Sequence, residues 1–326
     1  MAKVTVLGAG GWGLALALVL YENSHKVSVW TPFTEEAERL TVTRENQKLL
    51  SGIRIPDDIT VTTDITVAEG SEVTVIATPS FAVGQTAGRL AAVKNHGIVV
   101  NVAKGFEASS GRRLSEVIRD TLIDSDIAVL TGPSHAEEVA RKIPTMLTVS
   151  GENVAALKRV QEIFSNEFLR VYTNPDIIGA ELGGALKNII AVAAGVCDGM
   201  GLGDNSRAAL ITRGLSEMTR LGLALGASQT TFAGLSGMGD LIVTCTSRHS
   251  RNHRFGELVG RGTAVANALD AVGTVEGYFA CKTAYALAQR HSIDTPIITT
   301  CYQLLYEGQS VNDVVKNLMT RPFKQE

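Results

Sequence analysis

The first half of the chain alternates short apolar runs with segments of helical periodicity. The runs are rich in Val and Ile and predict strands at Lys3–Leu7, Val27–Trp30, Val73–Ala77, Ile98–Val102, Ile127–Leu130, Met146–Val149 and Phe168–Tyr172. Between them, apolar residues at helical spacing predict helices that include Leu14–Glu22, Glu35–Lys48, Leu114–Ile123 and Val154–Phe164. Continuous Val/Ile strands that alternate with helices are typical of a mostly parallel sheet covered on both faces.

The second half has a different pattern. From about Pro175 the strand-like runs stop, and helical segments separated by Gly or Pro continue to the end. The chain is therefore predicted to be an α/β protein with an N-terminal doubly wound Rossmann domain over residues 1–174. An all-α domain over residues 175–326 is predicted to follow it.

Composition narrows the class of protein. The chain has 30 basic and 33 acidic residues among 326, a balance that predicts neither a nucleic-acid-binding nor a membrane-binding surface. The three glycines near the N-terminus argue against a signal peptide. No stretch is expected to be long and apolar enough for a membrane helix, because the apolar run Ile189–Cys197 is too short to cross a bilayer. We expect a cytoplasmic enzyme without membrane insertion. Scattered cysteines, expected to be small buried residues rather than metal ligands, stand at Cys197, Cys245, Cys281 and Cys301.

A glycine motif joins the first strand to the first helix. Gly8 permits the tight turn, Gly10 lets a diphosphate approach the backbone, and Gly13 allows the helix to pack closely on the strand. The helix N-terminus that follows favours negative charge. The motif predicts a dinucleotide site, and an ordinary glycine-rich turn is the alternative.

Other strand ends should line the same edge of the sheet, because parallel strands end together. We expect Lys104 to touch an anionic or carbonyl ligand there, although a solvated loop lysine is the alternative. Ser134 either lines this crevice, caps a helix through Arg141, or does both. The segments after these strands are Thr78–Ser80, Ala103–Gly105 and Thr131–Ala136.

The end of the second strand does not state a cofactor preference. An acidic residue there binds the ribose of NAD, and an arginine nearby accepts the 2′-phosphate of NADP. Trp30-Thr31-Pro32-Phe33 contains neither, so NAD and NADP both remain as cofactors. Thr31 offers a hydroxyl where the ribose should lie.

The helical half contains one charged residue in an otherwise apolar segment. Within Leu182–Cys197 the only charge is Lys187, which Asn188 follows. An ionised lysine inside a core is costly unless it is paired or neutralised, and such a lysine is suited to proton transfer. Alternatively, its side chain reaches the surface. Asp240 is the predicted partner, although it could instead cap the helix through Thr244.

The segment Ser247–Arg254 is the densest group of cations in the chain. Ser250 is predicted to cap a helix whose first turn contains Arg251 and Asn252. Arginine is unfavourable at a helix N-terminus unless an anion binds there, so the pattern predicts a phosphate site. A solvated basic face is the alternative, and surface positions are expected for Arg248, His249 and Arg254.

Taken in order, these motifs resemble the bacterial-type NAD(P)-dependent glycerol-3-phosphate dehydrogenases. The residues that carry the resemblance are Gly8–Gly13, Ala103–Gly105, Gly132–Ala136, Leu182–Asn188, Arg213-Gly214, Gly239–Leu241, Ser250–Asn252 and Val275–Gly277. The chain departs from the family at Thr31-Pro32, where many bacterial relatives carry arginine or histidine. The stretch Gly273–Glu276 is also one residue shorter than the usual form.

The resemblance implies a Rossmann domain joined to a helical domain. It implies reversible reduction of dihydroxyacetone phosphate to sn-glycerol 3-phosphate, which supplies glycerophospholipid synthesis. Beyond the glycine motif, it implies cofactor contacts at Gly11, Trp12, Lys104, Ala136, Arg251, Val275 and Glu276. It implies contacts with glycerol phosphate at Lys104, Gly132, Ser134, Lys187, Asp240, Ser250, Arg251 and Asn252.

In this interpretation Lys187 transfers the proton, Lys104 and Asn188 hold the substrate oxygens, and Asp240 orients Lys187. Two other functions fit parts of the sequence. A β-hydroxyacid dehydrogenase would act on a carboxylate, and a non-catalytic NADP sensor would need no buried base. The expected partners are a small-molecule substrate and, as one option, a second copy of the chain in a homodimer.

Overall fold

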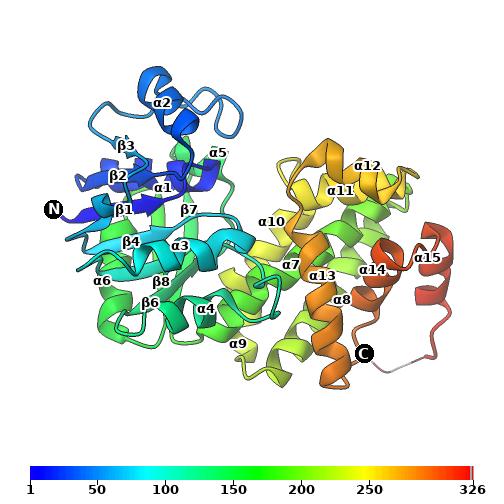
Figure 1. Ribbon diagram of the computed structural model, residues 1–326. Coiled ribbons are helices and arrows are strands. Elements are labelled where there is room, and N and C mark those ends of the chain that lie inside the picture. The colour runs from blue at the N-terminus through cyan, green and yellow to red at the C-terminus, as the bar shows by residue number, and fades with distance from the viewer. Residues whose placement is uncertain (324, 326) are drawn as a thin grey trace. The chain divides into compact units, whose positions relative to one another are not determined.

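The computed structural model describes residues 1–323 and 325. The chain forms two compact units, Met1–Glu181 and Leu182–Glu326 (Figure 1). The division falls within one long helix, α7 (Ile177–Gly199), whereas the boundary drawn from the sequence falls after residue 174 at the end of a strand.

The described residues of the N-terminal unit form an eight-stranded sheet of order β3-β2-β1-β4-β5-β6-β7-β8. Neighbouring strands are parallel except for β6 and β7, which are antiparallel, so the predicted doubly wound, mostly parallel sheet is confirmed. The sequence missed β3 because it has three residues and no apolar run. The strands are β1 (Lys3–Leu7), β2 (Lys26–Trp30), β3 (Thr60–Thr62), β4 (Val73–Ile76), β5 (Ile98–Asn101), β6 (Ile127–Thr131), β7 (Thr145–Gly151) and β8 (Leu169–Asn174).

Helices connect these strands, and one predicted helix was too long. The segment predicted as Glu35–Lys48 ends as a helix at Thr43, because Arg44 takes a left-handed conformation with φ of 52°. The α-helices that lie wholly within this unit are α1 (Gly11–Glu22), α2 (Thr34–Thr43), α3 (Val83–Leu90), α4 (Leu114–Thr121), α5 (Ala136–Ala140) and α6 (Val154–Phe164), and short 3-10 helices lie at Ile65–Ala68 and Ser80–Ala82.

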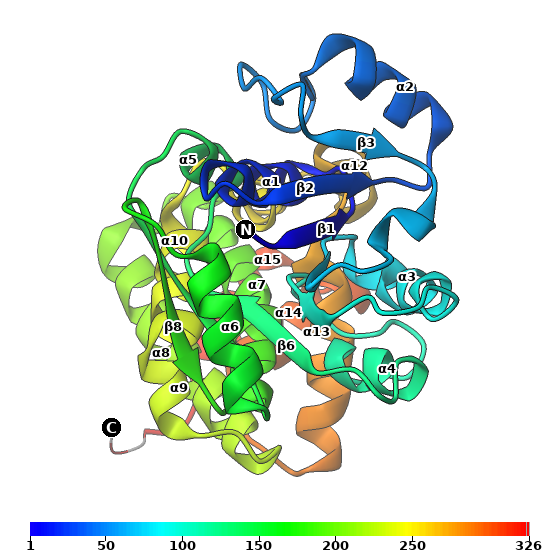
Figure 2. The ribbon, with the colours of Figure 1, turned by 90° about the vertical axis from the view of Figure 1, so that its left-hand side faces the viewer.

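Both faces of the sheet are covered by helices (Figure 2). On one face, Val4 and Val6 of the central strand β1 belong to a core that also contains residues of α1 and α6. On the other face, Leu7 and Ile76 belong to a core that contains residues of α3 and α4. Since side chains alternate along a strand, two buried faces require the continuous apolar strands that the sequence shows.

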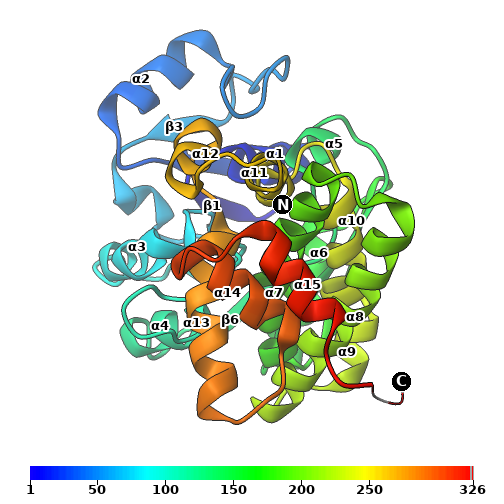
Figure 3. The ribbon, with the colours of Figure 1, turned by 90° about the vertical axis from the view of Figure 1, so that its right-hand side faces the viewer.

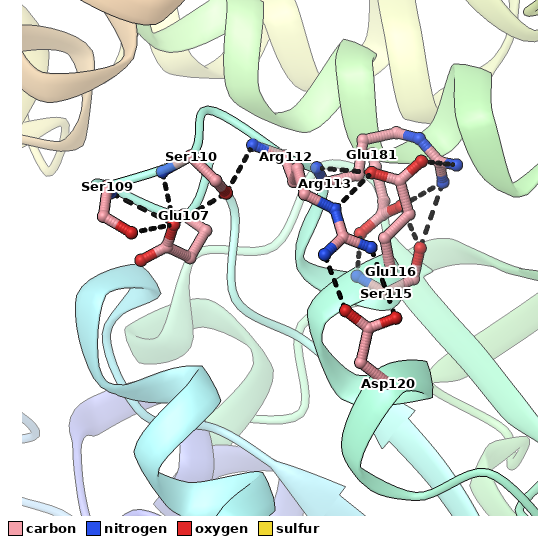
Figure 4. A network of polar contacts seen from close by, with 9 residues as sticks. All are labelled: Glu107, Ser109, Ser110, Arg112, Arg113, Ser115, Glu116, Asp120 and Glu181. Carbon is pink, nitrogen blue, oxygen red and sulfur yellow. Dashed lines mark hydrogen bonds and ion pairs between the residues drawn. The ribbon is translucent and has the colours of Figure 1, made fainter.

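A buried carboxylate ties the start of α7 to the start of α4 (Figure 4). Glu181 accepts hydrogen bonds from the Ser115 backbone N–H and from the Arg113 guanidinium, both at 2.8 Å. Burial raises the pKa of Glu181, and the charge of Arg113 opposes this shift. The first turns of α7 are therefore held within the N-terminal unit by an ion pair whose carboxylate is buried.

Every regular secondary-structure element among the described residues of the second unit is a helix, as predicted. In Figure 3, α14 lies between α13 and α15. Beyond α7, the elements are α8 (Gly203–Ala224), α9 (Gln229–Ala233), a π-helical turn (Leu235–Gly239), α10 (Asp240–Thr246), α11 (Arg251–Gly260), α12 (Val265–Val272), α13 (Glu276–Arg290), α14 (Pro296–Tyr306) and α15 (Val311–Met319).

Glycines bring α7 and α11 into backbone contact. A Cβ at Gly195 would lie 2.0 Å from the His253 carbonyl oxygen, and one at Gly256 would lie 2.0 Å from the Val192 carbonyl oxygen. No larger residue fits at either position without moving a helix. The cluster of glycines in this part of the sequence therefore marks close helix packing.

By length and composition, α7 could cross a membrane, so the expectation that no segment is long enough was wrong. Its most apolar window is 89% buried within the protein, as in a core helix. The cysteines are free thiols; three are buried and Cys197 is partly exposed. Burial raises the pKa of Cys245 to about 12 and that of Cys197 to about 11. Among the described residues no group of His, Cys, Asp and Glu side chains could hold a metal ion.

Candidate active site

The glycine loop has the geometry of a diphosphate cradle. Gly8 adopts φ of +130°, which favours glycine, and a Cβ at Gly13 would lie 2.1 Å from the Gly8 carbonyl oxygen. A Cβ at Gly10, in contrast, would meet nothing within 4 Å, so there is open space beside this residue. The first turn of α1 contains no acidic residue and has no side-chain cap. A diphosphate therefore fits the loop in both space and charge.

Residues distant in sequence hold this loop in place. The Asn46 side-chain amide donates a hydrogen bond to the Ala9 carbonyl oxygen at 3.1 Å. A Cβ at Gly11 would lie 2.6 Å from the Leu49 carbonyl oxygen and 3.7 Å from the Cβ of Ala136. The structure thus brings Ala136, at the start of α5, beside the glycine loop. Nothing in the sequence singled out Asn46, because its role depends on a contact across 37 positions.

Trp12 supports the same interpretation of the loop. Its indole Nε1 is buried and has no hydrogen-bond partner among the described residues. A buried N–H without a partner is costly unless a ligand or water accepts its hydrogen bond. Trp12 is the second residue of α1, so this donor lies within the glycine motif.

Lys104 lies in a polar cluster formed by the loops after β5 and β6. Its Nζ donates hydrogen bonds to the Gly132 carbonyl oxygen at 3.0 Å and to Ser134 Oγ at 3.1 Å. Ser134 Oγ also donates to the Gly132 carbonyl oxygen, at 2.9 Å. The N-cap of α5 is His135, and no side chain caps this helix, so Ser134 does not cap it. Its hydroxyl instead helps to position the lysine.

Near the end of β2 lies a carboxylate that the sequence analysis missed. Thr31 is buried, and its hydroxyl donates a hydrogen bond to Glu36 Oε2 at 2.5 Å. Glu36 belongs to the first turn of α2 and not to the strand end, where an acid would be expected in this fold. Its distance from the glycines, about twenty residues, is the signal that could have found it.

Lys187 is paired in the interior of the helical unit. Its Nζ donates hydrogen bonds to Asp240 Oδ1 and, at 2.7 Å, to Thr244 Oγ1. The side chains of Lys187 and Asp240 are 6% and 1% exposed, so the lysine does not reach the surface. The predicted contact is present. Asp240 is not an N-cap, because Gly239 precedes it in that position.

A π-helical turn directly precedes Asp240 and packs against α7. The turn, Leu235–Gly239, continues directly into α10, and a Cβ at Gly183 would lie 2.4 Å from the Ser236 carbonyl oxygen. Gly183 therefore lets α7 pack against this turn, one helical turn before Lys187. Such π-helical turns are frequent at functional sites. The sequence gave no indication of the turn.

Asn252 connects three helices beside Lys187. Its side-chain amide donates to Asn188 Oδ1 at 2.9 Å, and its Oδ1 accepts from the Gly277 backbone N–H at 2.8 Å. Asn188 in turn donates to the Gly184 carbonyl oxygen. Val275 is the N-cap of α13 and is fully buried, and Glu276 is the first residue of that helix.

The start of α11 is basic. Ser250 Oγ accepts a hydrogen bond from the His253 backbone N–H at 3.2 Å, so Ser250 is the predicted N-cap. Arg251 is exposed, and no hydrogen bond or ion pair joins its side chain to another described residue. The first turn has no acidic residue. An anion can therefore be held by this helix start and Arg251 together.

The structure thus gathers the predicted residues into separate groups. In the N-terminal unit, Gly8, Gly10, Gly11, Trp12, Gly13 and Ala136 form one group, Lys104, Gly132 and Ser134 a second, and Thr31 lies with Glu36. In the helical unit, Lys187 lies with Asp240, and Asn188 with Asn252, whereas Ser250 and Arg251 start α11.

A Rossmann-type sheet with a glycine loop, followed by a helical unit with a buried lysine–aspartate pair, defines the class of NAD(P)-dependent dehydrogenases. Residues 3–157 match the family model for the NAD-dependent glycerol-3-phosphate dehydrogenase N-terminus, and residues 176–316 match the model for its C-terminus. The chain belongs to the NAD-dependent glycerol-3-phosphate dehydrogenase family and is an oxidoreductase.

Individual relatives agree over the full length. The chain is 49% identical over 327 residues to glycerol-3-phosphate dehydrogenase [NAD(P)+] of Thermoanaerobacter sp. (strain X514), covering 99% of this chain and 98% of the relative. It is 46% identical to the protein of that name from Geobacillus thermodenitrificans, covering 100% and 97%. The crystal structure of glycerol-3-phosphate dehydrogenase from Coxiella burnetii superposes with a TM-score of 0.94 at 37% identity, covering 98% and 99%. The predicted family and NAD(P) dependence are confirmed.

Proposed function

We propose that the protein catalyses the reversible NAD(P)H-dependent reduction of dihydroxyacetone phosphate to sn-glycerol 3-phosphate. The buried pair of Lys187 and Asp240 carries this proposal. Reduction of a ketone requires a proton donor at its oxygen, and a lysine held by an acid in a dry interior is suited to that role. We place the reaction in the cytoplasm, where it would supply glycerophospholipid synthesis.

The dinucleotide would be held first by the glycine loop, whose open space at Gly10 and helix start suit a diphosphate. When bound, it supplies the hydride in one direction and accepts it in the other. Trp12 would offer its buried Nε1–H, and Thr31 would lie near the adenosine ribose. Further contacts are assigned to Gly8, Gly11, Gly13, Lys104, Ala136, Arg251, Val275 and Glu276.

Lys187 would donate its proton to the C2 oxygen of dihydroxyacetone phosphate and recover it from the alcohol in the reverse direction. Asp240 and Thr244 contact its Nζ and would keep it in one position throughout. Lys104 and Asn188 would hold substrate oxygens. Their own hydrogen bonds, from Lys104 to Ser134 and from Asn252 to Asn188, restrict the positions of these groups before substrate arrives.

The phosphate of the substrate would bind at the start of α11. Arg251 offers a guanidinium that can make two parallel hydrogen bonds, and the helix N-terminus adds backbone N–H groups. Ser250 and Asn252 flank it. The remaining substrate contacts are assigned to Gly132, Ser134 and Asp240.

Initial rates with dihydroxyacetone phosphate test this proposal, measured with NADH and with NADPH. Parallel assays use a β-hydroxy acid with NAD⁺ and NADP⁺. We expect turnover with dihydroxyacetone phosphate only. Turnover restricted to the carboxylate would indicate a β-hydroxyacid dehydrogenase, and cofactor binding with no turnover would indicate a redox sensor. Sedimentation analysis of the same sample tests the homodimer, which we propose as the assembly state.

A further inference from the structure

We propose that Glu36 selects the dinucleotide: its carboxylate accepts hydrogen bonds from the adenosine ribose and excludes a 2′-phosphate, so NADH binds more tightly than NADPH. This inference rests on the proposal that the dinucleotide lies on the glycine loop. It concerns a residue that neither the glycine motif nor the strand end contains.

The position of Glu36 follows from the register of the central strands. Leu7 at the end of β1 pairs with Trp30 at the end of β2, and the Gly8 backbone N–H donates to the Trp30 carbonyl oxygen at 2.8 Å. Thr31 therefore lies next to the start of the glycine loop on the adjoining strand. In a Rossmann fold the adenosine ribose of a dinucleotide reaches this strand end.

The Glu36 carboxylate is fixed there by its contacts. The Thr31 hydroxyl holds Oε2 at 2.5 Å, and Oε1 lies 4.0 Å from a guanidinium nitrogen of Arg39. The Glu36 side chain remains 23% exposed, so a ligand can reach the carboxylate. A carboxylate offers acceptors only, which match the ribose hydroxyl donors and repel a phosphate.

The surrounding groups offer little to a 2′-phosphate. Pro32 has no N–H, and the Phe33 N–H is directed at Thr31 Oγ1, 3.4 Å away. The first turn of α2, which would otherwise attract an anion, carries Glu35 and Glu36. Arg39 forms an ion pair with Glu36, which already partly neutralises the charge of this arginine. The local charge thus favours the unphosphorylated ribose.

Equilibrium binding measurements test recognition of the ribose independently of the catalysed reaction. Dissociation constants are measured by calorimetry for NADH, NADPH, ADP-ribose and 2′-phospho-ADP-ribose. For the wild type we expect each unphosphorylated ligand to bind at least about tenfold more tightly than its phosphorylated counterpart. Glu36→Gln keeps an acceptor for Thr31 but removes the charge, and it should tighten binding of both phosphorylated ligands about tenfold.

Glu35→Gln is the matched control, because it removes the same charge from an exposed neighbour in the same helical turn. It should leave the ratio of the dissociation constants for NADPH and NADH unchanged. Thr31→Val removes the hydrogen bond to the Glu36 carboxylate and should reduce the preference for NADH over NADPH. It provides a second variant if Glu36→Gln is too unstable to measure.

Three results would overturn the assignment. These are equal affinities of the wild type for NADH and NADPH, equal effects of Glu35→Gln and Glu36→Gln, and a selective loss of NADPH binding in Arg39→Ala. The last would show that Arg39 binds the phosphate. Absence of NADH and ADP-ribose binding would contradict the dinucleotide site itself and thereby the proposed function.

Discussion

The ammonium group of Lys187 donates a hydrogen bond to the carboxylate of Asp240, 53 positions later in the chain, and both side chains are almost completely buried. A lysine and an acid in a dry interior stabilise each other's charge, and neither is tolerated alone. One contact therefore serves both the stability of the helical unit and the proposed proton transfer.

Lys187→Ala should reduce turnover of dihydroxyacetone phosphate by about 10²–10⁴-fold, the usual loss for an acid–base group. The affinity for the dinucleotide should change little. Steady-state kinetics and equilibrium binding of NADH check the two statements. Lys282→Ala, at an exposed position of α13, is the control and should retain full activity. Near-normal turnover of Lys187→Ala would remove this lysine from the reaction.

Asp240→Asn should destabilise the protein by about 3–5 kcal/mol, because it leaves the charge of Lys187 buried without a partner. Chemical denaturation measures this loss. Replacing both residues, Lys187→Met with Asp240→Leu, should recover much of the stability while activity stays lost. If the double variant is no more stable than Asp240→Asn, the loss does not come from the unpaired charge.

Arg251→Ala should raise the KM for dihydroxyacetone phosphate about 10- to 150-fold, since a charged bidentate contact contributes roughly 1.5–3 kcal/mol. Unphosphorylated dihydroxyacetone should be affected far less. Arg254→Ala, an exposed arginine of the same helix, serves as the control. Equal losses on the two substrates would contradict the phosphate contact and favour a carboxylate substrate.

The buried side chain of Glu217 should make the stability of the folded protein depend on pH. It accepts hydrogen bonds from the backbone N–H groups of Ile297 and Ile298 at the start of α14. Burial raises the pKa of Glu217 to about 7 from its ordinary value of 4.5. The folded state therefore holds this proton more tightly than the unfolded state does, so its contribution is complete below pH 4.5 and is lost as pH rises through 7.

This change in the pKa of Glu217 corresponds to a loss of about 3 kcal/mol in the free energy of unfolding as pH rises from below 4.5 to above 7. Denaturation of the wild type at pH 5 and pH 8 measures it against Glu217→Gln, which keeps a hydrogen-bond acceptor but cannot ionise. The variant should lose most of the difference. An unchanged pH dependence would assign the effect to other groups.

Local patterns in the sequence determined most of the fold. Strands such as Val73–Ala77, observed as β4 over Val73–Ile76, were predicted because burial on both faces demands continuous apolar residues. The turn at Gly8 was predicted because only glycine adopts its positive φ easily. The helices of the second half were predicted from apolar residues at helical spacing. These features depend on neighbours within a few positions, so the sequence displays them directly.

The tertiary structure decided how distant residues combine. The sequence offered Asp240 to Lys187 only as one of two options, and packing of the π-helical turn against Gly183 settled it. The sequence did not show that β7 runs antiparallel to β6, because an apolar strand reads alike in both directions. The contact of Glu36 with Thr31 depended on where α2 begins. Such choices depend on how elements pack in three dimensions, and no short segment encodes them.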